Sequence, residues 1–208
     1  MNIRFSGREL RDLAVAWLAL GLAFTFFFER AIVAAVMRGN VESAVSAFPD
    51  TFLLVLVTVG VAFLLHELAH KVVAVRFGQL AEFRADFGML FIAVAGGLAG
   101  FIFAAPGAVY HRGRTTARER GLIALAGPAT NLVLAVVFLP LVFLGGYAVR
   151  IGFFGVVFNL FLAGFNMLPF GPLDGKTVLQ WNRVVFVLVF VPSALLGVLA
   201  FFALGSVI

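Results

Sequence analysis

The chain contains no cysteine, so it has no disulfide framework and no thiolate metal ligand. Charged residues are scarce as well, at 12% of 208 residues against roughly 25% in a soluble globular domain. Hydrophobic residues make up 63% of the chain, more than a soluble protein of 22.3 kDa can bury. The scarcity of charged residues and the excess of hydrophobic ones exclude a soluble enzyme, a disordered chain and a nucleic-acid-binding domain. The net charge of +5 does not change this, because the basic residues lie in short segments between apolar runs.

Six apolar stretches come near the roughly 20 residues that a helix needs to cross a bilayer. They are Leu13–Val36, Thr51–Val75, Phe87–Pro106, Leu122–Val149, Ile151–Leu168 and Val184–Ile208. The sequence therefore predicts an all-α polytopic membrane protein that forms one integral membrane domain over residues 1–208. We interpret the first stretch as a retained span, because it is long and no cleavage pattern of small residues follows promptly.

Basic residues predict the orientation, because cytoplasmic loops of membrane proteins carry an excess of lysine and arginine. The N-terminal segment holds three arginines and His111–Arg120 holds four. Both segments are cytoplasmic only if Phe87–Pro106 enters the membrane and returns on the same side. We therefore expect a multi-pass protein of the cell membrane with a cytoplasmic N-terminus and five or six transmembrane helices. A small membrane-re-entrant β element is expected near Ala108–His111, with a sixth span at 87–106 as the alternative.

The motif that carries chemistry is His66-Glu67-Leu68-Ala69-His70, which lies within the second apolar stretch. Histidines four residues apart share a helix face, so their imidazoles can bind one metal ion. Zinc makes a water molecule acidic, and Glu67 is placed to take its proton. A purely structural cluster is disfavoured, because ionisable groups are expensive inside a membrane.

Zinc needs a third protein ligand if one position is to stay open for water. His111 and four aspartates are the candidates, and Asp174 is favoured. Asp174 follows Pro169, Gly171 and Pro172, which interrupt a helix, and a broken helix can place a carboxylate inside the protein. The alternative is an ordinary turn in which Asp174 is a helix N-cap.

Two asparagines lie in apolar surroundings, where an amide needs a partner. Asn166 stands eight residues before Asp174 and is a candidate donor to the oxyanion that develops on a scissile carbonyl. Asn131 follows Gly127-Pro128-Ala129-Thr130. For Asn131 both a hydrogen bond between helices and a role at the substrate or oxyanion are open.

These motifs resemble those of the site-2 protease family of intramembrane zinc metalloproteases. The matching pieces are His66-Glu67-Leu68-Ala69-His70, Gly127-Pro128-Ala129-Thr130-Asn131 and Asn166-x-x-Pro169-x-x-Pro172-Leu173-Asp174-Gly175. The resemblance covers about Thr51–Gly175, the family's catalytic core. Lys176 departs from the pattern, since many relatives have a second glycine there.

The resemblance implies that His66, His70 and Asp174 bind one Zn²⁺ per chain. Glu67 then looks like the general base, and also the acid that protonates the leaving amine. Asn166 matches a residue that helps to hold substrate or oxyanion, and the stretch around 87–111 matches a re-entrant β element whose edge pairs with an unwound substrate. The activity implied is cleavage of transmembrane segments of membrane-protein substrates near the cytoplasmic leaflet, as in regulated intramembrane proteolysis.

Two other functions are compatible with the same polar cluster. A membrane transporter would use it as a proton or cation site, and would be expected to show paired repeats or several broken helices. A catalytically silent homologue would bind membrane helices as a chaperone or scaffold. The intact Glu67 argues against the silent homologue, because such a protein has no use for that group in hydrocarbon.

Overall fold

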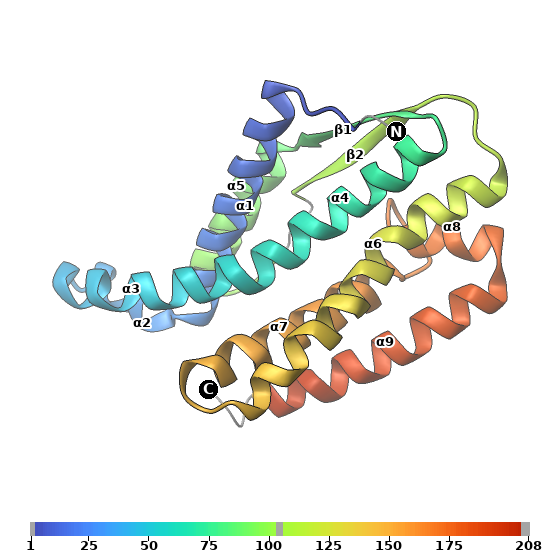
Figure 1. Cartoon of the computed structure of the whole chain (residues 1–208). Coiled ribbons are helices and arrows are strands. Elements are labelled where there is room, and N and C mark those ends of the chain that lie inside the picture. The colour runs from blue at the N-terminus through green and yellow to red at the C-terminus, as the bar shows by residue number, and fades with distance from the viewer. Residues whose placement is uncertain (1–2, 103–105, 205–208) are drawn as a thin grey trace. The chain divides into compact units, whose positions relative to one another are not determined.

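The computed structural model describes residues 3–102 and 106–204. Within these ranges the chain forms helices joined by short loops, together with one pair of strands (Figure 1). In chain order, the elements are α1 (Gly7–Phe28), α2 (Arg30–Met37), α3 (Val41–Val55), the π-helical turn η1 (Leu56–Gly60), α4 (Val61–Arg76), β1 (Leu80–Ala85), α5 (Phe87–Ala99), β2 (Gly107–Arg112), α6 (Ala117–Phe138), the 3₁₀ turn η2 (Leu139–Phe143), α7 (Gly146–Asn166), α8 (Asp174–Trp181) and α9 (Arg183–Leu204).

Five helical segments in the described part of the chain are long and apolar enough to cross a membrane. They are Gly7–Phe28, Phe48–Arg76, Ala117–Phe143, Gly146–Asn166 and Arg183–Ala200. Helix α5 has only 13 residues, about 20 Å, and the hydrocarbon core is about 30 Å thick. The predicted fold class, a helical polytopic membrane protein with a small β element, is therefore confirmed, with five candidate spans. That α5 re-enters on one side of the membrane stays a prediction.

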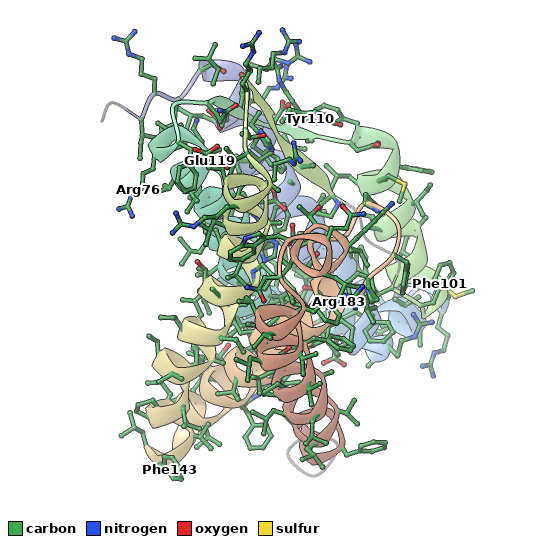
Figure 2. The ribbon with its side chains drawn as sticks, turned by 90° about the vertical axis from the view of Figure 1, so that its right-hand side faces the viewer. Arg76, Phe101, Tyr110, Glu119, Phe143 and Arg183 are labelled. Carbon is green, nitrogen blue, oxygen red and sulfur yellow. The ribbon has the colours of Figure 1, made fainter. Side chains whose placement is uncertain are left out.

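The chain divides into two compact units. The N-terminal unit comprises residues 5–61, 83–102 and 106–108, and in it α1 packs against α3 and α5. The other, here called the site unit, comprises residues 3–4, 62–82 and 109–204. In the site unit, α7 packs against both α6 and α9, and α8 also contacts α6 and α9. Helix α4 ends at Arg76 at the same end of the site unit where α6 begins near Glu119, so these two helices run in opposite directions (Figure 2). Phe143, which follows α6, lies at the other end.

Strands β1 and β2 form a two-stranded antiparallel sheet. At one end, the backbone N–H of Asp86 donates to the carbonyl oxygen of Pro106 at 3.1 Å. At the other end, the side-chain amide of Gln79 donates to the carbonyl oxygen of Arg114 at 3.0 Å. The extended piece predicted near Ala108–His111 is therefore confirmed as part of β2.

Two carboxylates of α1 cap the edge of β1 that faces away from β2. The backbone N–H of Phe83 donates to Glu9 Oε1 at 3.0 Å, and that of Ala85 donates to Asp12 Oδ2 at 3.3 Å. Both carboxylates are buried. Residues two apart in a strand direct their N–H groups to the same edge, so these bonds occupy one edge of β1. A further strand would have to pair with β2 instead.

The predicted helix break lies between α7 and α8 and is confirmed. Helix α7 ends at Asn166, and α8 begins at Asp174. In the turn between them Gly171 has a φ of +60°, which an L side chain rarely adopts. Gly175 allows a close approach as well, since a Cβ there would lie 2.7 Å from the Cα of the fully buried Met167. This folded-back turn places Asp174 in the first turn of α8.

Candidate metal centre

His66 and His70 lie one turn apart on the same face of α4. Their rings meet edge to face, with centroids 4.6 Å apart, and both side chains are buried. Their Nε2 atoms are 3.0 Å from each other. Glu67, the next residue on the helix, is 9% exposed, so all three polar groups of the motif are withdrawn from solvent.

Asp174 comes from α8 to meet this pair. Its Oδ2 atom lies 3.3 Å from the Nε2 atoms of both His66 and His70. The three ligand atoms lie within 4.8 Å of one another, close enough to hold a metal ion. In residues 3–102 and 106–204 no other group of three histidine or acidic side chains meets this condition. The structure thus brings together the three residues that the sequence predicts as metal ligands.

The remaining ring nitrogens of the two histidines face hydrogen-bond acceptors. His70 Nδ1 lies 2.7 Å from the carbonyl oxygen of Ile123, which can only accept, so this nitrogen carries the proton. His66 Nδ1 lies 2.6 Å from Asn131 Oδ1. Because the Asn131 amide nitrogen donates to the carbonyl oxygen of Ala62 at 3.2 Å, its oxygen is the atom turned toward the imidazole. In the neutral rings, both Nε2 lone pairs therefore point into the same small space.

The arrangement of these donors fits a zinc ion. Two unprotonated nitrogens and a carboxylate oxygen, 3.0 to 3.3 Å apart, repel one another unless a cation lies among them. A tetrahedral zinc ion with bonds of about 2.0–2.1 Å needs its ligand atoms about 3.3–3.4 Å apart. The observed separations agree within a few tenths of an ångström. Imidazole and carboxylate ligands that leave a fourth position open suit zinc in a catalytic site.

One stripe of α6 supports the two imidazoles. Ile123, Gly127 and Asn131 are spaced by four residues and so share a helix face. The first and last of them bind the two Nδ1 atoms. Between them, a Cβ added at Gly127 would lie 2.5 Å from His66 Nε2, so only glycine lets the helix backbone come this close. Gly127 is therefore part of the centre, although the sequence showed it only as a member of a motif.

The histidines of this site shift the pKa values of two groups outside the candidate membrane spans, Asp174 and His111. Burial raises the pKa of the Asp174 carboxyl, but the charges that His70 and His66 carry when they are protonated, together with their hydrogen bonds, outweigh burial and bring that pKa to about 2. The carboxylate is therefore ionised at neutral pH, the form that binds a metal. Burial lowers the pKa of His111 on β2, and the charge of His70 lowers it further. His111, the other third-ligand candidate, lies outside the metal group.

The asparagines have different surroundings. The Asn166 amide donates to the carbonyl oxygen of Leu162 in its own helix at 3.0 Å, and its role at an oxyanion stays a prediction. Asn131 contacts His66, and its role at the substrate also stays a prediction. Asn159 of α7 was missed by sequence reasoning, yet it is fully buried and its Oδ1 accepts from Asn131 at 2.9 Å. The same signal would have found it, because it too is an amide within an apolar stretch.

Comparisons with known proteins place the chain among its relatives. It is 40% identical over 194 residues to the "Putative zinc metalloprotease MJ0611" of Methanocaldococcus jannaschii, an alignment covering 91% of this chain and 92% of that protein. It is 34% identical over 149 residues to the "Putative zinc metalloprotease YwhC" of Bacillus subtilis, covering 60% of this chain and 66% of that protein. No family model and no solved structure matched the chain. The chain therefore belongs to the same protein family as the Methanocaldococcus jannaschii relative, whose printed name is "Putative zinc metalloprotease MJ0611".

Proposed function

We propose that this protein is an intramembrane zinc metalloendopeptidase of the site-2 protease family. The observation that carries the proposal is the convergence of His66, His70 and Asp174, with Glu67 beside them, in and against the apolar span Phe48–Arg76. One Zn²⁺ per chain would be held by the two Nε2 atoms and the Asp174 carboxylate. The names of the two relatives support the zinc and protease parts of this proposal.

Glu67 is the proton carrier in the proposed reaction. When bound, zinc polarises the scissile carbonyl and makes water acidic enough to lose a proton near neutral pH. The Glu67 carboxylate takes that proton as the water oxygen bonds to the carbonyl carbon. It then gives the proton to the amide nitrogen as the C–N bond breaks, so that an acid and an amine result. Asn166 is a proposed donor toward the substrate or its oxyanion. Asn131 is proposed to act on the substrate only through His66, because its two amide protons already go to the carbonyl oxygen of Ala62 and to Asn159 Oδ1.

The substrates proposed are transmembrane segments of other membrane proteins. A peptide bond within a helix is shielded by the helix's own hydrogen bonds, so such a segment must unwind before it is cut. Strand β2 offers a place for the unwound backbone, because Glu9 and Asp12 already occupy the outer edge of β1. The backbone N–H of Val109 in β2 interacts with the Glu67 carboxylate, so a peptide that pairs with β2 would take the place of Glu67 at this N–H and lie beside the base.

The proposed orientation puts the N-terminus in the cytoplasm and the protein in the cell membrane. Arg76 lies at the same end of the site unit as Glu119, where α6 begins (Figure 2). The four arginines of His111–Arg120 belong to the segment that leads into that end. An excess of arginine on one side is typical of cytoplasmic loops, so we infer that this end faces the cytoplasm and that cleavage occurs near that leaflet.

The test is cleavage of a panel of single-span substrates by the purified full chain in lipid vesicles. Wild type is compared with Glu67→Gln, which keeps the side-chain size and removes the base. We expect wild type to cut at least one substrate and the variant to lose about 10²–10⁴-fold in rate, while both bind one zinc per chain. Normal cleavage by Glu67→Gln would remove the mechanism. Absence of both cleavage and zinc in wild type would favour a protein that only binds membrane helices.

A further inference from the structure

Three polar side chains from three helices form one buried series of hydrogen bonds, here called the relay. His66 of α4 meets Asn131 of α6 at 2.6 Å, and Asn131 Nδ2 donates to Asn159 Oδ1 of α7 at 2.9 Å. The Asn159 amide nitrogen in turn donates to the carbonyl oxygen of Gly155 at 2.8 Å. Asn131 and Asn159 are both fully buried, so no solvent competes for these groups.

The direction of every hydrogen bond in this series follows from two backbone carbonyls, that of Gly155 beside Asn159 and that of Ala62 beside Asn131. The carbonyl oxygen of Gly155 can only accept, so Asn159 must turn its amide nitrogen toward it and its oxygen toward Asn131. Asn131 presents its nitrogen both to Asn159, at 2.9 Å, and to the carbonyl oxygen of Ala62, at 3.2 Å, and so turns its oxygen to His66. An oxygen at that position accepts a hydrogen bond from a protonated Nδ1 of His66, which leaves Nε2 unprotonated in the neutral ring. A metal binds only the unprotonated nitrogen.

We propose that Asn159 is a positioning residue for the metal centre, acting through Asn131 to hold His66 in the tautomer that binds zinc. The inference rests on the zinc site of the proposed function and adds a residue of α7 to it. His70 needs no such relay, because a backbone carbonyl, that of Ile123, fixes its tautomer directly. The relay thus does for His66 what the main chain does for His70.

A purely structural role of Asn131 and Asn159 would affect protein stability but not zinc affinity. Asn131 and Asn159 also connect α6 with α7, and hydrogen bonds between transmembrane helices stabilise packing. If packing were their whole role, removing them would lower the melting temperature and leave the zinc affinity of the folded protein unchanged. The relay predicts instead that affinity follows the acceptor at position 159, independently of stability.

Zinc affinity of the purified full chain in detergent, measured by competition with a chromophoric chelator, separates these roles. Asn159→Leu removes the acceptor, and Asn159→Asp keeps an oxygen for the Asn131 amide. Val157→Ala is the matched control, because it opens a cavity at a fully buried apolar position of the same helix. We expect Asn159→Leu to lose about tenfold in affinity, at the lower end of the effect of groups that orient a ligand. We expect Asn159→Asp and Val157→Ala to stay within about threefold of wild type.

The tautomer itself is measured on the metal-free protein by ¹⁵N NMR with labelled histidine. The chain contains only three histidines, and His111→Gln removes one signal set without touching the centre. We expect His66 Nδ1 to carry a proton in this background, whether or not Nε2 is also protonated without metal, and to carry it in only part of the molecules after Asn159→Leu. This measurement uses neither activity nor bound zinc.

The results distinguish the relay from the function on which it rests. Wild type that binds no zinc contradicts the proposed function. Wild type that binds zinc, with Asn159→Leu equal to it in affinity, overturns the relay alone. A His66 Nδ1 found without its proton in the metal-free wild type overturns the relay even if Asn159→Leu does not fold.

Discussion

Gly127→Ala is the smallest change that should destroy the metal centre. The added methyl carbon would lie 2.5 Å from His66 Nε2, and real Cβ contacts are essentially never below 3.0 Å. It would press on the nitrogen atoms that bind the metal. The imidazoles cannot easily retreat, because their Nδ1 atoms are held by Asn131 and Ile123 on the same helix. Either the rings or α6 must move.

The size of that movement follows from the distances. An ordinary contact of 3.4 Å requires a displacement of about 0.9 Å, which would stretch hydrogen bonds of 2.6 and 2.7 Å past their useful range. Metal sites tolerate ligand errors of about 0.2 Å. We therefore expect a loss in zinc affinity of about 100-fold, the upper end of what disrupted ligand support costs. Overpacking should also lower the free energy of unfolding by about 1–3 kcal/mol.

The assay is competition for zinc with a chromophoric chelator, together with thermal melting in detergent. Gly7→Ala is the matched control, because a Cβ at that position of α1 meets open space. The control should bind zinc as wild type does and melt at the same temperature or slightly above it. Wild-type zinc affinity in Gly127→Ala would refute the reasoning, since α6 could then not lie against the imidazoles as described.

Three further predictions concern single side chains. Asp174→Asn should lower zinc affinity by about 100-fold in the same titration, because an amide is a much weaker ligand than a carboxylate; equal affinity would remove Asp174 from the centre. His111→Gln should change zinc affinity by less than about twofold, whereas a loss as large as that of Asp174→Asn would make His111 a ligand. Glu9→Ala leaves the buried N–H of Phe83 without its charged acceptor and should cost about 1.5–3 kcal/mol of unfolding free energy; an unchanged denaturant midpoint would show that the β1 edge needs no cap.

Much of the site was predictable from the types and the spacing of its residues. His66 and His70 are polar groups at helical spacing within an apolar run, and a helix places such a pair on one face whatever surrounds it. Asp174 follows prolines that must interrupt a helix. The carbonyl of Ile123 could not be predicted, since every residue has one and only the packing of α6 selects it. Asn159 was open to the same reasoning as Asn131, but its partner depends on how α7 packs.

The fold was predictable at the level of spans and less so at their ends. Hydrophobic length identifies a candidate span, but it does not show where a helix begins. The first apolar stretch, Leu13–Val36, runs across two helices, because α1 ends at Phe28 and α2 begins at Arg30. The third stretch holds the 13-residue α5, whose length depends on the left-handed Gly100 that ends it. The capping of β1 by Glu9 and Asp12 joins residues more than 70 positions apart, which no local pattern reveals.

The most direct test of the central claim is X-ray absorption at the zinc edge on the purified protein, with metal content measured on the same sample. We predict one zinc per chain, bound at about 2.0–2.1 Å by two imidazole nitrogens and by oxygen, with the signal lost in Asp174→Asn. A zinc-free wild type, or zinc that keeps the same ligands after Asp174→Asn, would contradict the account.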